Sequence, residues 1–203
     1  RQERVAWAML PVFLNLLCKF YLMRASAREQ GNGGHFAART EKALCSAFLR
    51  TKDRRTYMIL TKEQLHDALV ERHGAEIQKK LDGATVGIAG LGGLGSNLAV
   101  FLARLGIGHM ILVDFDVVDI TNLNRQHYTM KDLGVPKTLA LVEQLEAINP
   151  YLNYETYTER VIPANVKRLF SECDVIVEAF DKPDQKAMLI ENVLTQLPDK
   201  PLV

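Results

Sequence analysis

The sequence predicts an α/β fold in which a doubly wound, mostly parallel sheet carries helices on both faces. From residue 58 onward, short apolar runs typical of buried strands alternate with longer segments whose apolar residues recur at helical spacing. The first of these runs ends in GLGGLG, residues 90–95, directly before a helix-like segment. A glycine-rich turn at this position is typical of Rossmann-like sheets.

The elements follow in a regular order along residues 58–203. A capping box formed by Thr61 and Gln64 predicts the start of the first helix. The alternation of strands and helices indicates parallel pairing with both faces of the sheet covered. Strands are expected at 84–89, 109–114, 153–159, 174–180 and 201–203, and helices at 62–74, 96–105, 137–148, 163–173 and 184–197.

Residues 1–57 differ from the rest and are expected to form an N-terminal helical or irregular extension of unclear role. The apolar run 5–23 resembles a secretory signal, but Asn15 and Lys19 fit poorly with a membrane span. Residues 28–42 are glycine-rich and charged, as in a linker. The apolar run 201–203 predicts a strand that has only begun, so we expect the second domain, 58–203, to be C-terminally truncated.

Composition excludes several classes of function. A formal net charge of +1 with 24% charged residues does not favour nucleic-acid binding, and we expect no membrane partner. The three cysteines, Cys18, Cys45 and Cys173, form neither a CxxC pair nor a disulfide framework. A reducing, cytoplasmic location is therefore expected.

The glycine turn has the spacing of a dinucleotide- or nucleotide-binding loop. Gly90 allows a tight turn, Gly92 allows a ligand close to the backbone, and Gly95 allows close packing of helix and strand. The helix that follows offers free N–H groups to a phosphate. Asp114 lies 19 residues after Gly95, where an acid reaches a ribose hydroxyl.

The loop after Asp114 favours a triphosphate over a redox dinucleotide. Arg125 is suited to hold phosphate oxygens bidentately, and Lys137 adds a point charge at a helix start. Two such cations are useful where phosphorus is attacked, because phosphoryl and nucleotidyl transfer depend on positioning and charge neutralisation. At the end of the 174–180 strand, Asp181 could hold a magnesium ion. Polar residues of the loop that we expect near the phosphates are Asp116, Asn122, Asn124 and Gln126.

The motifs GLGGLGS, LVDFD, TNLNRQ, GVPK and AINP, followed by Asp181, resemble the ThiF/MoeB/HesA family in order and spacing. The resemblance covers about residues 61–203 and is greatest to the ThiF-type members of thiamine biosynthesis. Members of this family adenylate ubiquitin-like sulfur-carrier proteins and are related to ubiquitin-activating enzymes. One departure is Lys182, which stands where the family often has Asn.

The resemblance implies an adenylyltransferase that binds ATP with Mg²⁺ and is typically a homodimer. The C-terminal glycine of a carrier ending in Gly-Gly would attack the α-phosphate and give an acyl-adenylate and pyrophosphate. Gly93 would lie against the nucleotide and Asp114 would hold the ribose. Arg125, Lys137 and Asp181 would be the catalytic residues, and Asp181 the metal ligand. The residues that would line the phosphates are Thr121, Asn122, Leu123, Asn124 and Arg125.

Three alternatives remain open from the sequence. A related activating enzyme could act on another target, as a tRNA-dehydratase-like or peptide-modifying member. An NAD-dependent oxidoreductase would use the same glycine turn, but it has no need of Arg125, Lys137 and Asp181. A non-catalytic nucleotide-sensing or dimerising module is the third.

Overall fold

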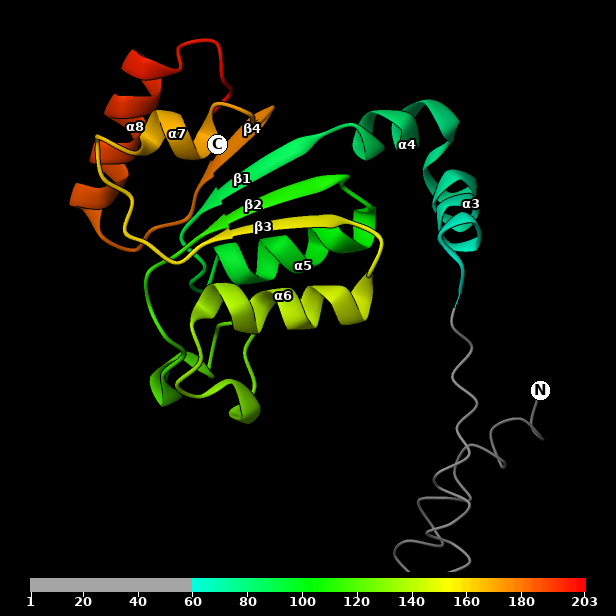
Figure 1. Cartoon of the computed structure of the whole chain (residues 1–203), viewed down its shortest axis with the longest axis horizontal. Coiled ribbons are helices and arrows are strands. Elements are labelled where there is room, and N and C mark those ends of the chain that lie inside the picture. The colour runs from blue at the N-terminus through cyan, green and yellow to red at the C-terminus, as the bar shows by residue number, and fades with distance from the viewer. Residues whose placement is uncertain (1–59) are drawn as a thin grey trace, which may run out of the picture. The chain divides into compact units, whose positions relative to one another are not determined.

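A four-stranded parallel sheet forms the centre of the part of the chain that the structure, a computed structural model, describes, residues 60–203 (Figure 1). The predicted extension, 1–57, lies outside these residues. Spatially, the strands follow the order β3 (Asn153–Tyr157), β2 (His109–Val113), β1 (Thr85–Ala89) and β4 (Val175–Glu178). Because β1 pairs with both β2 and β4, the strand order reverses beside it, and this is where such sheets bind ligands.

Helices cover both faces of this sheet, as predicted. On one face lie α5 (Gly95–Leu105) and α6 (Lys137–Ile148), and on the other α7 (Val166–Phe170) and α8 (Pro183–Gln196) (Figure 1). The doubly wound fold class is thereby confirmed.

Alternate side chains of the strands supply two apolar cores. Ile88 packs toward α5 and α6, whereas Ala89 packs toward α7 and α8. Gly87 has no side chain because a Cβ there would lie 2.6 Å from Cys173 Sγ and 2.8 Å from Phe170 Cδ1. Cys173 is fully buried, and burial raises the pKa of its thiol to about 12, so it acts as a small core residue.

Two helices precede β1. In α3 (Lys62–His73) the predicted capping box is present, since the Gln64 N–H donates to Thr61 Oγ1 over 3.2 Å and the Thr61 N–H donates to Gln64 Oε1 over 3.0 Å. Helix α3 ends at Gly74, and a second helix, α4 (Ala75–Asp82), begins directly after it. Within residues 60–203, no helix combines the length and apolarity that crossing a membrane requires.

Four predicted elements are at least two residues shorter than expected, among them the 174–180 strand, which is found as Val175–Glu178. The 153–159 strand stops at Tyr157, and the chain then turns along the edge of the sheet. The 163–173 helix begins only at Val166, because Asn165 closes a turn by accepting the Ile162 N–H over 2.9 Å. The strand expected at 201–203 is a single parallel bridge between Leu202 and Ile176.

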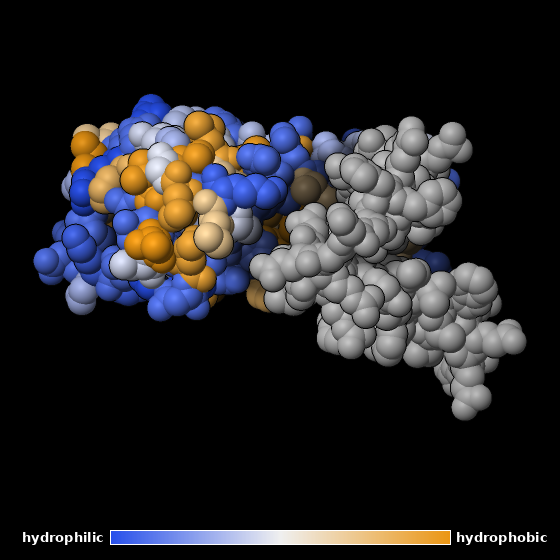
Figure 2. All heavy atoms as spheres, turned by 90° about the horizontal axis from the view of Figure 1, so that it is seen from below, coloured by the Kyte–Doolittle hydropathy of each residue, from blue (hydrophilic) through white to orange (hydrophobic). Residues whose placement is uncertain are grey.

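The segment between β2 and α6 forms a loop with two short turns. These are the 3₁₀ turns η1 (Ile120–Asn122) and η2 (Met130–Asp132), and a bridge between Val117 and Pro136 closes the loop at its base. Figure 2 shows apolar side chains gathered on the face where this loop and α6 lie in Figure 1. Exposed apolar residues there include Ile120, Met130, Leu133 and Leu139.

Candidate functional site

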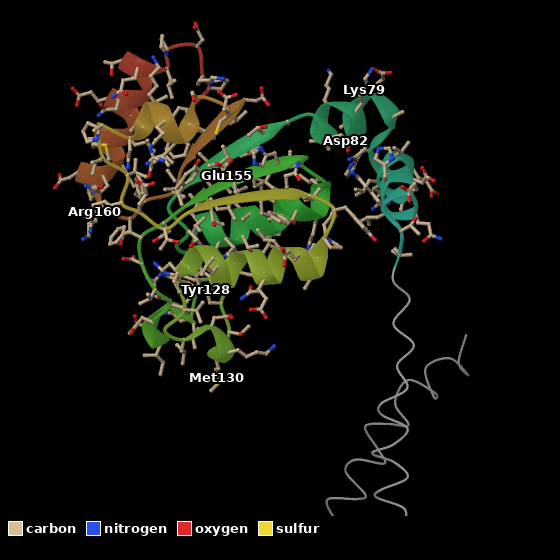
Figure 3. All side chains as sticks on the ribbon, viewed as in Figure 1. Lys79, Asp82, Tyr128, Met130, Glu155 and Arg160 are labelled. Atoms are coloured by element: carbon tan, nitrogen blue, oxygen red, sulfur yellow. The ribbon has the colours of Figure 1, made fainter. Side chains whose placement is uncertain are left out.

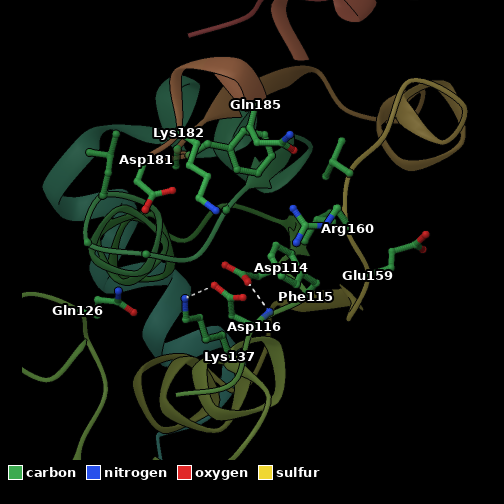
Figure 4. Close-up of a pocket in the computed structure, with 18 of the residues that line it drawn as sticks. Asp114, Phe115, Asp116, Gln126, Lys137, Glu159, Arg160, Asp181, Lys182 and Gln185 are labelled. Atoms are coloured by element: carbon green, nitrogen blue, oxygen red, sulfur yellow. Dashed lines mark hydrogen bonds and ion pairs between the residues drawn. The ribbon is translucent and has the colours of Figure 1, made fainter. Parts of the chain in front are cut away.

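A cavity of about 400 Å³ opens at the carboxyl ends of the strands (Figure 4). Four segments line it: the glycine turn after β1, the β2 end with its loop, the segment after β3, and the β4–α8 connection. These segments are distant in sequence and meet only because parallel strands present the same ends to one edge of the sheet. A cavity of this size accommodates a small-molecule ligand.

The glycine turn brings the start of α5 to the floor of the cavity. Gly90 has a φ of +96°, a left-handed conformation that favours glycine, and its N–H donates to the Val113 carbonyl over 2.9 Å. At Gly95 a Cβ would lie 1.9 Å from the Gly90 carbonyl oxygen, so only glycine lets the helix begin this close to the turn. Gly92 and Gly93 line the cavity directly.

Three helices begin at the cavity: α5, α6 and α8. Their cap residues, Leu94, Pro136 and Lys182, make no side-chain cap hydrogen bond, in contrast to Thr61 at α3. The first N–H groups of a helix lack intrahelical partners and carry the positive end of its dipole. Some of these N–H groups already have backbone acceptors, as for Ser96 and Lys137, and Pro183 has no N–H, so it is the positive dipole ends of the three helices that favour an anionic ligand.

Asp114 ties the end of β2 to the glycine turn. Its Oδ2 accepts the Leu91 N–H over 2.7 Å, and its Oδ1 accepts the Asp116 N–H over 2.8 Å. Only 8% of the residue is exposed. Burial raises the pKa of this carboxyl above its usual value, and the two backbone N–H groups partly oppose that shift. Each oxygen keeps a lone pair that could accept a ligand hydroxyl.

Lys137 is a buried cation held by a single carboxylate. Its Nζ donates to Asp116 Oδ2 over 3.0 Å, and its backbone N–H donates to the Asp116 carbonyl over 3.0 Å (Figure 4). The ammonium is thus fixed at the start of α6, where it adds to the positive end of the helix. Asp116, half-exposed, positions this cation.

Arg125 is exposed on the cavity wall and is steadied by its own loop. Its Nη1 donates to the Thr121 carbonyl over 3.1 Å and to Asn124 Oδ1 over 2.9 Å. Neighbouring Gln126 is buried, and its Oε1 has no hydrogen-bond partner. A buried amide oxygen without a donor costs free energy, so this position has unused capacity to accept a hydrogen bond.

The structure does not place all of the predicted phosphate residues on the cavity. Among residues 121–126, only Arg125 and Gln126 line it. The preceding residues form η1, in which Asp119 accepts both the Thr121 N–H and its hydroxyl. Thr121 and Asn124 hold the Arg125 side chain by hydrogen bonds. The predicted residues that lie outside the cavity lining are Thr121, Asn122, Leu123 and Asn124.

Three hydrogen bonds fasten this loop to the glycine turn and the start of α5, one of them from Asn97 Nδ2 to the Arg125 carbonyl over 3.0 Å. The Tyr128 hydroxyl donates to the Leu91 carbonyl over 2.8 Å, and the His127 N–H donates to Ser96 Oγ over 3.0 Å. Figure 3 shows Tyr128 beneath the sheet, between α6 and the loop. Because Tyr128 is buried, its pKa is raised and it remains a neutral donor. The Arg125 segment therefore has a fixed position relative to Gly92 and Gly93.

Asp181 follows β4 and lines the cavity as predicted. Its side chain is exposed, and it pairs with no cation among the described residues. Within residues 60–203 there is no cluster of three or more histidine, cysteine or acidic side chains able to hold a metal by itself. A cation bound here would therefore take most of its coordinating oxygens from water or a bound molecule.

The structure adds cavity residues that sequence reasoning missed. The Arg160 guanidinium lies over the Phe115 ring, 3.8 Å from its centroid, near the end of β3 (Figures 3 and 4). Glu159, next to it, is turned toward Arg168 over 2.7 Å. Phe115, Glu159 and Arg160 lie two or three residues after a strand end, and that position is the signal that could have found them. The polar and aromatic cavity residues added by the structure include Phe115, Glu159, Arg160, Lys182 and Gln185, and the apolar ones include Leu94, Val113, Val161, Ala179 and Phe180.

Comparison with known proteins gives consistent matches over this part of the chain. A family model described as the ThiF family matches residues 64–203. The sulfur carrier protein adenylyltransferase of Thermus thermophilus is 34% identical over 148 residues, which are 70% of this chain and 54% of that protein. The adenylyltransferase and sulfurtransferase uba4 of Aspergillus fumigatus is 30% identical over 171 residues, 82% of this chain and 34% of that protein.

A solved structure extends the comparison to three dimensions. The E. coli tRNA N6-threonylcarbamoyladenosine dehydratase TcdA, crystallised in complex with ATP, superposes with a TM-score of 0.65 at 29% identity. The match covers 71% of this chain and 60% of that one. Of the two sequence relatives described above, the chain spans about half of the T. thermophilus protein and about a third of the A. fumigatus protein.

Proposed function

The chain belongs to the ThiF family, and from that membership we propose that it is an adenylyltransferase acting on a ubiquitin-like sulfur-carrier protein. ATP and the C-terminal glycine of the carrier would react to give an acyl-adenylate and pyrophosphate. One observation carries the proposal. A single cavity brings together the glycine turn, three uncapped helix starts, Arg125 and Lys137.

The proposed reaction needs charge neutralisation more than proton transfer. A carboxylate oxygen of the carrier forms a bond to the α-phosphorus, and the bond from that phosphorus to the bridging oxygen breaks, so that pyrophosphate leaves with the electron pair. The carboxylate is already ionised at neutral pH, and no general base is required. Arg125 and Lys137 would reduce the repulsion between the two anions.

The other cavity residues would orient the nucleotide. Asp114 could accept a ribose hydroxyl with its remaining lone pairs, and Gly93 leaves room for the nucleotide against the turn. Gln126 could accept a hydrogen bond with its unpartnered oxygen.

A magnesium ion fits the acids of this site. Magnesium in nucleotide sites is commonly held by one or two carboxylates together with substrate phosphates. Asp181, exposed and without an ion pair in the described part of the chain, is such a carboxylate. When bound, the ion would neutralise phosphate charge.

The proposal also names the molecule that is adenylated, a sulfur-carrier protein. A sulfur carrier is supported by the names of the T. thermophilus and A. fumigatus relatives. The similarity to TcdA supports a second candidate, an activating enzyme of the same chemistry with another target. We place the activity in residues 58–203 of a cytoplasmic homodimer and assign no role to 1–57.

The test is ATP–pyrophosphate exchange in the presence of purified carriers ending in Gly-Gly, beginning with one from thiamine biosynthesis. Carrier-dependent exchange is expected, and a carrier without its last glycine is the control. Absence of exchange with any such carrier, from protein that binds ATP, would favour another target. A parallel thermal-shift assay should show stabilisation by ATP of about 2.7 kcal/mol at a hundredfold excess over Kd. Stabilisation by NAD alone would contradict the proposal.

A further inference from the structure

Lys182 occupies a position on the cavity that the family resemblance does not explain. It directly follows Asp181, stands at the N-cap position of α8 without a side-chain cap hydrogen bond, and lines the cavity with an exposed side chain. Figure 4 shows its amino group reaching from the β4–α8 side toward Asp114 and Asp116. The side chain therefore points into the space where a nucleotide would lie.

The acids near Lys182 leave its charge uncompensated. Glu178, the acid at the end of β4, is paired with Lys186 over 2.9 Å. Asp116 is paired with Lys137 over 3.0 Å. Among the described residues no carboxylate forms an ion pair with Lys182. This ammonium is thus available to a ligand.

The position is also electrostatically unfavourable in the free protein. A cation at a helix N-terminus is repelled by the positive end of the dipole, and α8 is 14 residues long with no side-chain cap. Asp184 in the first turn offsets part of this repulsion. An anion between the ammonium and the helix start would interact favourably with both.

We infer that Lys182 binds the terminal phosphates of the nucleotide, as a cation additional to Arg125 and Lys137; the inference rests on the proposed function. Asp114, the proposed ribose acceptor, lies at the end of β2, whereas Lys182 follows β4 on the other side of β1. A nucleotide whose ribose lies at Asp114 and whose phosphates cross the glycine turn would bring its β- and γ-phosphates to Lys182.

Isothermal titration of the full chain with AMP, ADP, ATP and inorganic pyrophosphate tests this. Lys182→Ala should weaken ATP binding about tenfold, the loss expected for one charge-assisted hydrogen bond, and AMP binding less than about twofold. Lys182→Arg should retain most of the ATP affinity. Lys167→Ala, which removes an exposed lysine of α7 outside the cavity, is the control.

The outcomes separate the inference about Lys182 from the proposed function. Equal weakening of AMP and ATP would place Lys182 away from the terminal phosphates, and an unchanged ATP affinity would remove it from the site; either overturns the inference alone. Wild-type protein that binds no ATP would overturn the proposed function together with the inference. Thermal unfolding of the free variants, and Lys182→Gln as a second neutral replacement, keep a folding defect from being mistaken for lost binding.

Discussion

Arg125 is positioned by its own loop before any substrate binds. Its contacts with the Thr121 carbonyl and Asn124 Oδ1 use one nitrogen, which leaves the rest of the guanidinium for a ligand. We expect Arg125→Ala to lower ATP–pyrophosphate exchange about a hundredfold, or about 3 kcal/mol of transition-state stabilisation. Arg104→Ala, at the far end of α5, is the control. Exchange by Arg125→Ala at the wild-type rate would show that the guanidinium does not act in the reaction.

Asp114 gives the stability of the protein a distinctive pH dependence. Burial raises its pKa in the folded state, so the folded protein keeps this proton to a higher pH than the unfolded chain. Its contribution to the free energy of unfolding is present at low pH and declines as pH rises through the folded pKa. The Tm of wild type minus that of Asp114→Asn should therefore fall as pH rises above about 4, the ordinary pKa of an aspartate. A difference that grows as pH rises would contradict the raised pKa.

Asp114→Asn also replaces an oxygen that accepts a backbone N–H, so an offset independent of pH is expected in the same measurement. This offset does not change how the Tm difference between wild type and Asp114→Asn varies with pH. Nucleotide binding should weaken as well, because the amide is a poorer acceptor for a hydroxyl than the carboxylate.

Among the elements, the glycine turn contains glycines with two different roles: Gly95 is required by packing, whereas Gly92 leaves space for a ligand. Gly95→Ala should destabilise the fold by about 3 kcal/mol, because the new Cβ would lie 1.9 Å from the Gly90 carbonyl oxygen. At Gly92 the nearest atom, Gln126 Nε2, is 3.9 Å from a Cβ, so Gly92→Ala should change stability by less than about 1 kcal/mol.

Urea unfolding of both variants measures these free energies, and ATP titration of Gly92→Ala adds a second result. Weaker ATP binding by a normally stable Gly92→Ala protein would indicate that the ligand lies against this backbone. Two equally destabilised variants would mean that the turn is less tightly packed than the structure indicates.

The sequence predicts long, periodic elements of this fold well and short ones poorly. Helices α5 and α6 have enough turns for their apolar spacing to be distinctive, and both are found within one residue of the expected bounds. Helix α7 has five residues, too few for a periodic signal, and its start depends on a turn closed by Asn165. The bridge at Leu202 depends on pairing with a distant strand.

The cavity residues divide in a similar way. Gly90, Asp114 and Lys137 follow recognisable spacings and were expected at the site. Arg160 and Phe115 face the cavity because β3 and β2 end at the same edge, and no local motif records that their side chains stack. Which residues of a loop face inward, such as Arg125 but not Asn122, depends on the η1 turn and its hydrogen bonds.

At the scale of the whole molecule, α5 presents an exposed apolar stripe. Leu94, Phe101 and Leu105 lie on one face of this helix, with exposed fractions of 60%, 62% and 40%. If the proposed homodimer forms through this stripe, Phe101→Glu should raise the dimer dissociation constant at least about thirtyfold. Sedimentation velocity measures it, with Ile190→Glu on α8 as a control of 41% exposure. A wild-type protein that sediments as a monomer would refute the homodimer.

The strand order has a consequence for synthesis of the chain on the ribosome. β1 lies between β2, which emerges soon afterwards, and β4, which begins only at residue 175. Until then a nascent chain has one open edge of β1 and an incomplete cavity, because Asp181 and Lys182 have not been made. Open strand edges pair with other chains. Slow translation between β3 and β4 should therefore increase the need for chaperones, and ATP could stabilise the protein only once β4 has been added.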